Sequence, residues 1–165
     1  SEESLKGCLA DFELPADVHL KELSMGQRKK AYIAFAMATN TNCLLMDEPT
    51  NGLDIPSKSQ FRKVIARSMS DERMVMISTH QVHDVEQLLD HILILDQNDM
   101  LLNASVQEIQ DQYTFEYRSA QEMDETVLYS EPALQGNAVI AERKEGDAET
   151  QVNLELLFNF KTQSK

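Results

Sequence analysis

Two short apolar runs in the sequence each end in a pair of side chains that can take part in catalysis. The run "CLLM" is followed by Asp47 and Glu48, and "MVMIS" is followed by Thr79 and His80. If the two runs are neighbouring parallel strands, their carboxyl ends meet at one edge of a sheet and bring the four side chains together. One carboxylate can hold Mg²⁺ through water, a second can deprotonate an attacking water, and a histidine can contact a terminal phosphate. The pattern predicts a site for a nucleoside triphosphate.

The stretch "LSMGQRKKAYIAF" at residues 23–35 is a second candidate site. Ser24 and Gln27 have the S-x-x-Q spacing of a capping box, which predicts the start of a helix. Three cations follow at 28–30, although a helix N-terminus favours acidic side chains. Cations and free backbone N–H groups at a helix start can receive an anion, and Gly26 lets a phosphate approach the backbone closely. The stretch therefore predicts a capped helix whose first turn can bind an anion.

The elements that must position these residues alternate between strand and helix. Short apolar runs predict strands, and apolar residues spaced three and four apart predict the helices that cover them. This alternation implies right-handed crossovers and an α/β fold with a mostly parallel sheet. The predicted strands are 43–46, 74–78, 91–96 and, as an antiparallel partner, 100–103; the predicted helices lie within 1–22, from Ser24 to near residue 38, from Pro56 through Met69, over 82–89, and from Ser105 to Gln112.

The sequence changes character after residue 112. Aromatic and β-branched residues, with the turn signals "EPALQGN" and "KEGD", predict a small β-rich appendage. Its last segment, 152–160, alternates like a strand but also has the apolar spacing of a short helix capped by Asn153, and we favour the helix. We predict two domains on this basis, 1–112 and 113–165.

The composition excludes several classes of protein. The chain of 165 residues is 42% hydrophobic and 26% charged, which is typical of a globular, soluble protein. Its net charge of -13 argues against binding to a phosphate backbone, so no nucleic-acid partner is expected. No apolar run approaches the ~20 residues of a membrane span. Cys8 and Cys43 lack metal-binding or redox spacing and are expected to be reduced, structural thiols.

Four motifs, taken in order, resemble those of the ATP-binding cassette (ABC) family of transport ATPases. "LSMGQ" resembles the signature motif, "CLLMDEP" the Walker B strand, "NGLD" the D-loop, and "STHQ" the segment with the switch histidine. The resemblance covers roughly residues 20–112. It implies part of a P-loop NTPase-like fold, with ATP and Mg²⁺ as cofactors.

The resemblance also implies a role for each candidate residue at the strand ends. Asp47 would be the metal-binding residue that serves Mg²⁺. Glu48 would be the general base, and His80 would hold the γ-phosphate, which makes these two the candidate catalytic residues.

A second ATPase domain, in a head-to-tail dimer, is the first partner that the resemblance implies. Ser24, Gly26 and Gln27 would contact the γ-phosphate of the ATP that this second domain holds. Asp54 would cross the dimer interface. These four are the candidate nucleotide-binding residues.

The sequence departs from the family pattern in two places. Met25 stands where the family usually has glycine, so close approach of a phosphate there depends on Gly26. No G-x-x-x-x-G-K-[ST] loop occurs, so nothing in the chain cradles the α- and β-phosphates. We expect the chain to be the carboxyl-terminal part of a longer ATPase, inactive by itself, with core-type strand residues such as Leu45 and Val75 meeting water.

Three functions remain open from the sequence. The leading one is part of the ATP-hydrolysing subunit of an ABC transporter, which works with a membrane-spanning subunit on the cytoplasmic, inner face of the cell membrane. The alternatives are a soluble ABC-type ATPase, of the translation-factor or DNA-repair type, and a non-catalytic module that only donates its signature face. Glu48 and His80 weigh against the last, because a structural partner need not keep both.

Overall fold

The computed structural model describes residues 1–163 and divides the chain into two compact units, Ser1–Leu88 and Leu89–Lys165. The predicted domain boundary, between residues 112 and 113, falls inside the second unit, where one helix ends at Gln112 and a strand begins at Tyr113. The division into domains 1–112 and 113–165 stays a prediction. No helix within residues 1–163 is long and apolar enough to cross a membrane.

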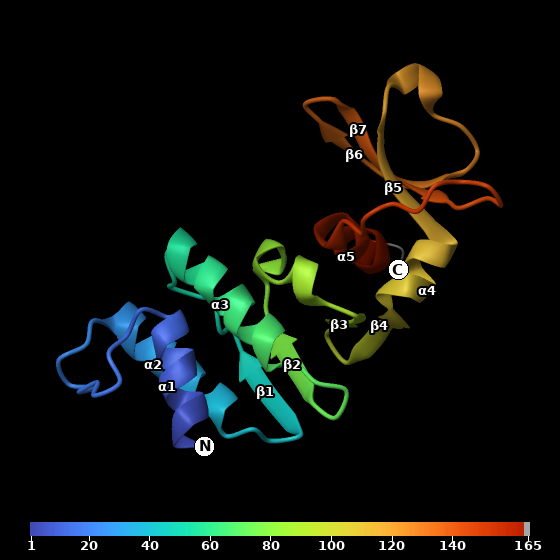
Figure 1. Ribbon diagram of the computed structural model, residues 1–165. Coiled ribbons are helices and arrows are strands. Elements are labelled where there is room, and N and C mark those ends of the chain that lie inside the picture. Colours follow the sequence, from blue (N-terminus) through green and yellow to red (C-terminus); the bar gives the residue numbers. More distant parts are fainter. Residues whose placement is uncertain (164–165) are drawn as a thin grey trace. The chain divides into compact units, whose positions relative to one another are not determined.

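The first unit combines three helices with two strands (Figure 1). Each helix begins where the sequence supplies a cap: the side chains of Ser1, Ser24 and Asp54 accept hydrogen bonds from backbone N–H groups in the first turns. In chain order the elements are α1 (Glu2–Asp11), α2 (Met25–Ala38), β1 (Cys43–Asp47), α3 (Ile55–Ser68), β2 (Met74–Ser78) and two short 3₁₀ turns, Val82–Asp84 and Glu86–Leu88.

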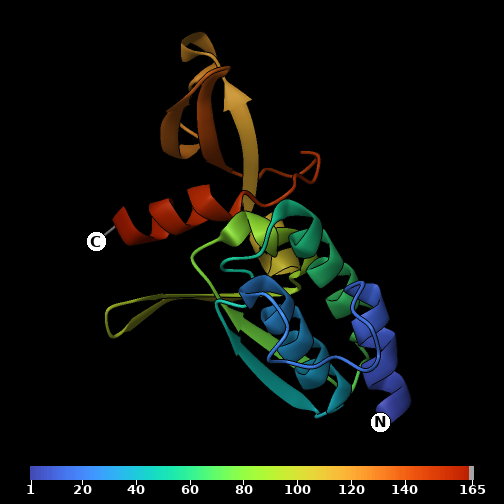
Figure 2. The same cartoon turned by 90° about the vertical axis from the view of Figure 1, so that its left-hand side faces the viewer.

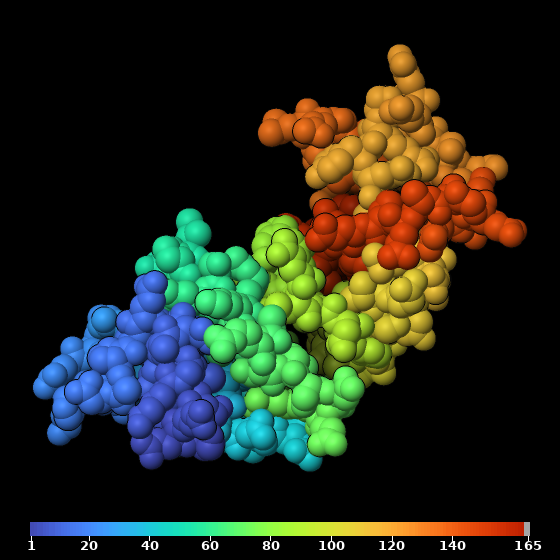
Figure 3. Space-filling view, in the orientation of Figure 1, coloured from blue at the N-terminus to red at the C-terminus, as the bar shows by residue number. Residues whose placement is uncertain are grey.

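The core of the first unit lies among its helices. Phe12, Met37, Phe61 and Val64 are almost fully buried there. Figure 3 shows α1 and α3 packed against each other at the surface of this unit. The Arg67 guanidinium of α3 bonds both carboxylate oxygens of Asp11, at 2.6 and 2.7 Å, and so ties the two helices together.

The two strands of the first unit form a parallel pair in the predicted order. The pairing runs from Cys43 opposite Met74 to Asp47 opposite Ser78. Figures 1 and 2 show α1, α2 and α3 on one side of this pair. The helices therefore leave the other face in solvent, where Leu45 is 69% exposed. The expectation that Leu45 meets water is confirmed, whereas Val75 is half-buried.

The sequence-based prediction of a helix over residues 82–89 is wrong. The segment instead forms two 3₁₀ turns, in which each N–H donates to the carbonyl three residues earlier, such as Val85 N–H to Val82 O at 3.1 Å and Leu88 N–H to Val85 O at 2.8 Å. Val85 is buried, but Val82 and Leu88 are only half-buried, so the apolar face that would stabilise an α-helix is incomplete. The Lys58 ammonium also bonds the Asp84 carboxylate at 2.8 Å, which holds the segment against α3.

The second unit is built from antiparallel strands and two helices. The predicted antiparallel partner is confirmed, since β3 (His91–Asp96) pairs with β4 (Asp99–Ser105). The expected α/β class is also confirmed, but parallel pairing among the described residues is limited to β1 and β2. The other elements are α4 (Val106–Gln112), β5 (Tyr113–Arg118), a 3₁₀ turn at Ala120–Glu122, β6 (Val127–Ala133), β7 (Gly136–Glu142) and α5 (Leu154–Gln163), with β7 between β5 and β6.

Local caps place the two helices of the second unit as the sequence predicts. Ser105 and Glu108 form a capping box at the start of α4. The last segment is a helix and not a strand: Asn153 Oδ1 accepts from Leu156 N–H at 3.0 Å, and Leu154 and Leu157 are buried. The strand alternation in this segment is therefore incidental, because the cap and the buried leucines both require the helix.

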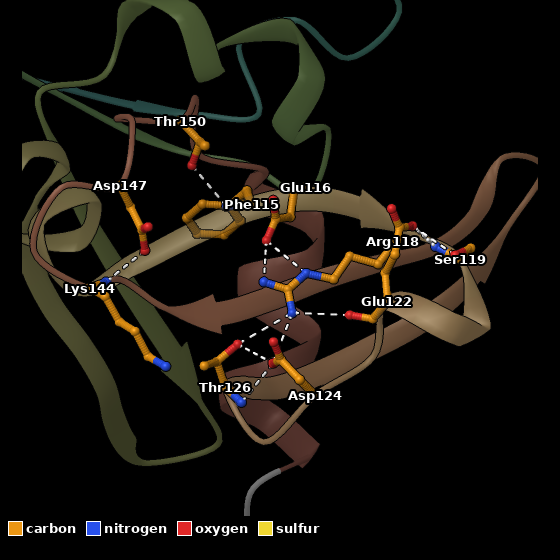
Figure 4. Close-up of polar contacts among 10 residues, drawn as sticks. All are labelled: Phe115, Glu116, Arg118, Ser119, Glu122, Asp124, Thr126, Lys144, Asp147 and Thr150. Carbon is orange, nitrogen blue, oxygen red and sulfur yellow. Dashed lines mark hydrogen bonds and ion pairs between the residues drawn. The ribbon is translucent and has the colours of Figure 1, made fainter.

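A polar network around Arg118 joins β5 to the loop that follows it (Figure 4). The guanidinium bonds Glu116 at 2.6 Å and Asp124 at 3.0 Å. Asp124 also accepts hydrogen bonds from the hydroxyl and the backbone N–H of Thr126. These Thr126 bonds, helped by Arg118, lower the pKa of Asp124 to about 2. The network is a structural feature that closes the loop at 119–126.

Candidate active site

The carboxyl ends of β1 and β2 bring the predicted catalytic side chains together. Asp47 lies opposite Ser78 in the parallel register, and the Ser78 hydroxyl donates a hydrogen bond to Asp47 Oδ1. The chain then leaves β1 at Glu48, whose N–H donates to Ser78 O at 2.8 Å. Glu48 has a φ of 45°, which is uncommon for a residue with a side chain. This turn sends the Glu48 carboxylate across toward the end of β2.

The Glu48 carboxylate is held by both residues that follow β2. It accepts from the Thr79 hydroxyl at 2.9 Å and from the His80 backbone N–H at 3.0 Å, and it lies 2.6 Å from His80 Nδ1. The His80 side-chain bond is the largest cause that lowers the pKa of Glu48 below its ordinary value; partial burial opposes it, and Thr79 adds to it. The carboxylate is therefore ionised at neutral pH and oriented by three hydrogen bonds.

The hydrogen bond to Glu48 decides which ring nitrogen of His80 carries a proton. A carboxylate can only accept, so Nδ1 is the protonated nitrogen, an assignment made from the hydrogen-bond network. The His80 side chain is 72% exposed, which leaves Nε2 facing solvent. His80 can therefore meet a ligand through Nε2 while Glu48 fixes the ring.

The capping box predicted at the start of α2 is present. Ser24 N–H donates to Gln27 Oε1 at 3.0 Å, and Gln27 N–H donates to Ser24 Oγ at 3.3 Å. Both side chains act here as acceptors, so the Ser24 hydroxyl hydrogen and the Gln27 NH₂ group remain as donors for a ligand. The position of a Cβ at Gly26 meets no atom within 4 Å, and the Met25 side chain is 88% exposed. The first turn of α2 is thus open to solvent.

The three cations that follow the cap are all bonded to oxygen atoms of the chain. Arg28 donates to Lys21 O at 3.2 Å, and Lys30 donates to Gln60 Oε1 at 3.3 Å. The Lys29 ammonium donates to the backbone carbonyls of Glu48, at 2.9 Å, and of Asn51, at 2.6 Å. The sequence pattern predicts an anion-binding group here, and it does not reveal the contact of Lys29 with the loop after β1. Nothing in the spacing could have revealed it, because the two segments are far apart in the chain.

Asp54 lies at the start of α3, where it caps the helix. Its Oδ1 accepts from Ser57 N–H at 2.9 Å, and the hydrogen bonds from the Ser57 hydroxyl and backbone lower the pKa of Asp54 below its ordinary value. The residue is exposed. This cap explains why α3 begins at Ile55, while the role of Asp54 at a dimer interface stays a prediction.

The donor set at the strand ends fits a magnesium ion that arrives with a nucleotide. Mg²⁺ keeps several waters and uses one or two carboxylates together with substrate phosphates. Asp47 offers one exposed carboxylate, oriented by Ser78. Within residues 1–163 no group of three or more His, Cys, Asp or Glu side chains could hold a metal by itself. The site therefore suits a metal that is shared with phosphates and not a closed protein cage.

Solved structures of ATP-binding cassettes have the same fold as much of this chain. A structure described as the ATP-binding subunit of an ABC transporter superposes with a TM-score of 0.58 at 22% identity, over 66% of this chain and 46% of that one. A second, described as an ATP-binding cassette of an ABC transporter, gives a TM-score of 0.52 at 23% identity, over 62% of this chain and 42% of that one. The fold is that of an ATP-binding cassette domain.

Sequence comparison shows which known proteins the chain resembles. The family model described as ABC transporter matches residues 3–51, a range that includes the α2 cap, Asp47 and Glu48. The energy-coupling factor transporter ATP-binding protein EcfA2 of Mycoplasmoides gallisepticum is 32% identical over 56% of this chain and 29% of its own length. The protein of the same name from Ligilactobacillus salivarius is 33% identical over 58% of this chain and 35% of its own length.

A third relative, the Nod factor export ATP-binding protein I of Neorhizobium galegae, is 28% identical over 56% of this chain and 26% of its own length. The chain thus spans about a third of the length of the curated relatives it matches. Together with the fold, these matches show that the chain is similar to ATP-binding domains of ABC transporters.

Proposed function

We propose that the protein containing this chain is the ATP-binding and ATP-hydrolysing subunit of an ABC transporter and couples hydrolysis to transport across a membrane. The observation that carries this proposal is the Glu48 carboxylate, ionised and held by Thr79 and His80 at the ends of two parallel strands. A general base must be deprotonated and pointed at its substrate before reaction, and this arrangement meets both conditions. The family match supplies ATP as the nucleotide.

Each residue at the strand ends has its own role in hydrolysis. Glu48 accepts the proton of the attacking water, and Asp47 holds Mg²⁺, directly or through water. ATP with Mg²⁺ supplies the phosphoryl group and the positive charge that neutralises it. His80 donates from Nε2 to the γ-phosphate. Since Nδ1 already donates to Glu48, this contact requires His80 in its imidazolium form.

The start of α2 serves the ATP of a second ATPase domain. The Ser24 hydroxyl, the Gln27 NH₂ group and the backbone at Gly26 donate to the γ-phosphate that this second domain holds, in a head-to-tail dimer. The open surface at Gly26 and the donors left by the capping box support this assignment. Asp54, exposed at the start of α3, lies at the dimer interface.

The remaining partners follow from the proposed transport function. A membrane-spanning subunit carries the substrate path, and the ATPase binds to it as a peripheral protein on the cytoplasmic face of the cell membrane. The relatives are components named for transport, which supports this partner. A nucleic-acid partner is not part of the proposal, because a net charge of -13 opposes binding to a phosphate backbone.

Substitution of Glu48 in the complete protein tests the proposed function. Glu48→Gln removes the base but retains the shape, so hydrolysis of Mg·ATP should fall to background while ATP binding persists. Asp47→Asn should instead weaken Mg·ATP binding. Glu72→Gln, at an exposed glutamate next to β2, is the matched control and should leave both measurements unchanged. Near-normal turnover in the Glu48 variant would contradict the assignment of the base.

A further inference from the structure

Lys29 connects α2 to the loop that carries the candidate base. Its Nζ donates to Glu48 O at 2.9 Å and to Asn51 O at 2.6 Å. These two carbonyls belong to the first and last residues of a turn, because Asn51 N–H also donates to Glu48 O, at 3.2 Å. One ammonium therefore holds both ends of the turn that follows β1.

The backbone at Glu48 needs such support. Its φ of 45° lies in the left-handed region, which a residue with a side chain occupies only when its surroundings hold it there. The N–H side of Glu48 is fixed by Ser78 O at 2.8 Å. On the carbonyl side, Lys29 adds a charge-assisted bond to the weaker bond from Asn51 N–H. Rotation of either peptide would turn the side chain away from Thr79 and His80.

The position of Lys29 on α2 suits it to hold the turn after β1 in one conformation. Lys29 lies in the second turn of α2 and is half-buried, so its stem is held by a regular element and not by a loop. Its two acceptors are neutral carbonyls, so the bond does not neutralise the Glu48 carboxylate. The ammonium can thus hold the backbone of the base while the carboxylate keeps its charge for proton transfer.

We propose that Lys29 is a positioning residue for Glu48: by holding the Glu48 and Asn51 carbonyls, it keeps the base in the left-handed conformation that directs its carboxylate to Thr79 and His80. The inference rests on the proposed function for its kinetic consequence, but its structural part stands on the chain alone. A merely structural lysine would affect folding stability without changing the turn or the His80 ring.

The first test uses the 165-residue chain and needs no hydrolysis. Lys29→Met removes the donors and retains much of the stem, whereas Lys29→Arg retains the charge and the donors. In Lys29→Met, hydrogen exchange at Asn51 N–H should rise about tenfold or more, and the ¹⁵N spectrum of the His80 ring should lose its protonated Nδ1 signature. Lys29→Arg should restore both. Lys63→Met, at an exposed lysine of α3, is the charge-matched control and should change neither.

The second test uses the complete protein. Lys29→Met should lower kcat about 10- to 100-fold, because the base is misplaced, and should change KM for ATP by less than about threefold. Lys29→Arg should recover most of the rate.

The outcomes separate the inference from the proposed function. If Lys29→Met leaves both the Asn51 exchange and the His80 signature at the values of Lys63→Met, the inference is overturned. If these signals change as expected but the unsubstituted complete protein does not hydrolyse ATP, the positioning role stands and the proposed function fails. Should Lys29→Met not fold, Lys29→Gln, which keeps an uncharged NH₂ group, decides the same question by an intermediate change in both signals.

Discussion

Truncation of Phe61 should lower the stability of the first unit by a large, measurable amount. It lies on α3, which packs with α1 and α2, and its side chain is 0% exposed. Truncation to alanine removes the buried ring and leaves a cavity, a change that costs about 3–5 kcal/mol for a phenylalanine in a core. Domains of this size have only about 5–15 kcal/mol of stability, so Phe61→Ala should remove a large fraction of it.

The loss should be visible in urea denaturation followed by circular dichroism, since the chain contains no tryptophan. With a urea dependence of about 1–3 kcal/mol per molar, the midpoint should fall by roughly 1–5 M. The effect should extend to the candidate site, because the Lys58 ammonium of α3 bonds Gln81, at 3.1 Å, and Asp84, just after His80. Hydrogen exchange at these residues should therefore increase as the packing of α3 weakens.

Phe35 provides the matched control. It is the same residue type, in the same unit, but its side chain is 62% exposed. Phe35→Ala should therefore shift the free energy of unfolding by no more than about 0.5 kcal/mol. Equal midpoint shifts for Phe35→Ala and Phe61→Ala would refute the reasoning, because they would show that burial among these helices does not set the stability of the unit.

Three further predictions concern reactivity, pH and activity. Cys43 is exposed and should react rapidly with a thiol reagent. Burial shields the Cys8 thiol and raises its pKa, so Cys8 should react only as the chain unfolds. Equal reaction rates for the two thiols would contradict this expectation. The pKa of Asp124 is lowered to about 2, so the stability that its carboxylate contributes is present above the ordinary pKa and is lost as pH falls from about 4 toward 2. Asp124→Asn should therefore flatten the dependence of the second unit's stability on pH in that range. An unchanged dependence would argue against the Arg118 network. Phosphate release by the 165-residue chain with Mg·ATP should remain at background, because no P-loop cradle is present in it, and robust turnover would overturn that expectation.

Local patterns in the sequence were sufficient to predict much of this protein. The capping boxes of α2 and α4 and the Asn153 cap of α5 depend on residues three apart in the chain, so the sequence displays them directly. The positions of β1 and β2 follow from their apolar runs. Because parallel strands end at the same edge, the meeting of Asp47, Glu48, Thr79 and His80 could also be predicted.

Only the tertiary structure decided the features that depend on contacts between distant segments. The apolar spacing over 82–89 predicted a helix, but partial burial and the Lys58 bonds gave two 3₁₀ turns. The strand at 91–96 was expected in a mostly parallel sheet, but among the described residues it pairs with its predicted antiparallel partner alone. Lys29 appeared as an anion-binding cation until the fold placed the Glu48 and Asn51 carbonyls beside it. A side chain's type limits what it can bond, whereas packing determines which partner lies within reach.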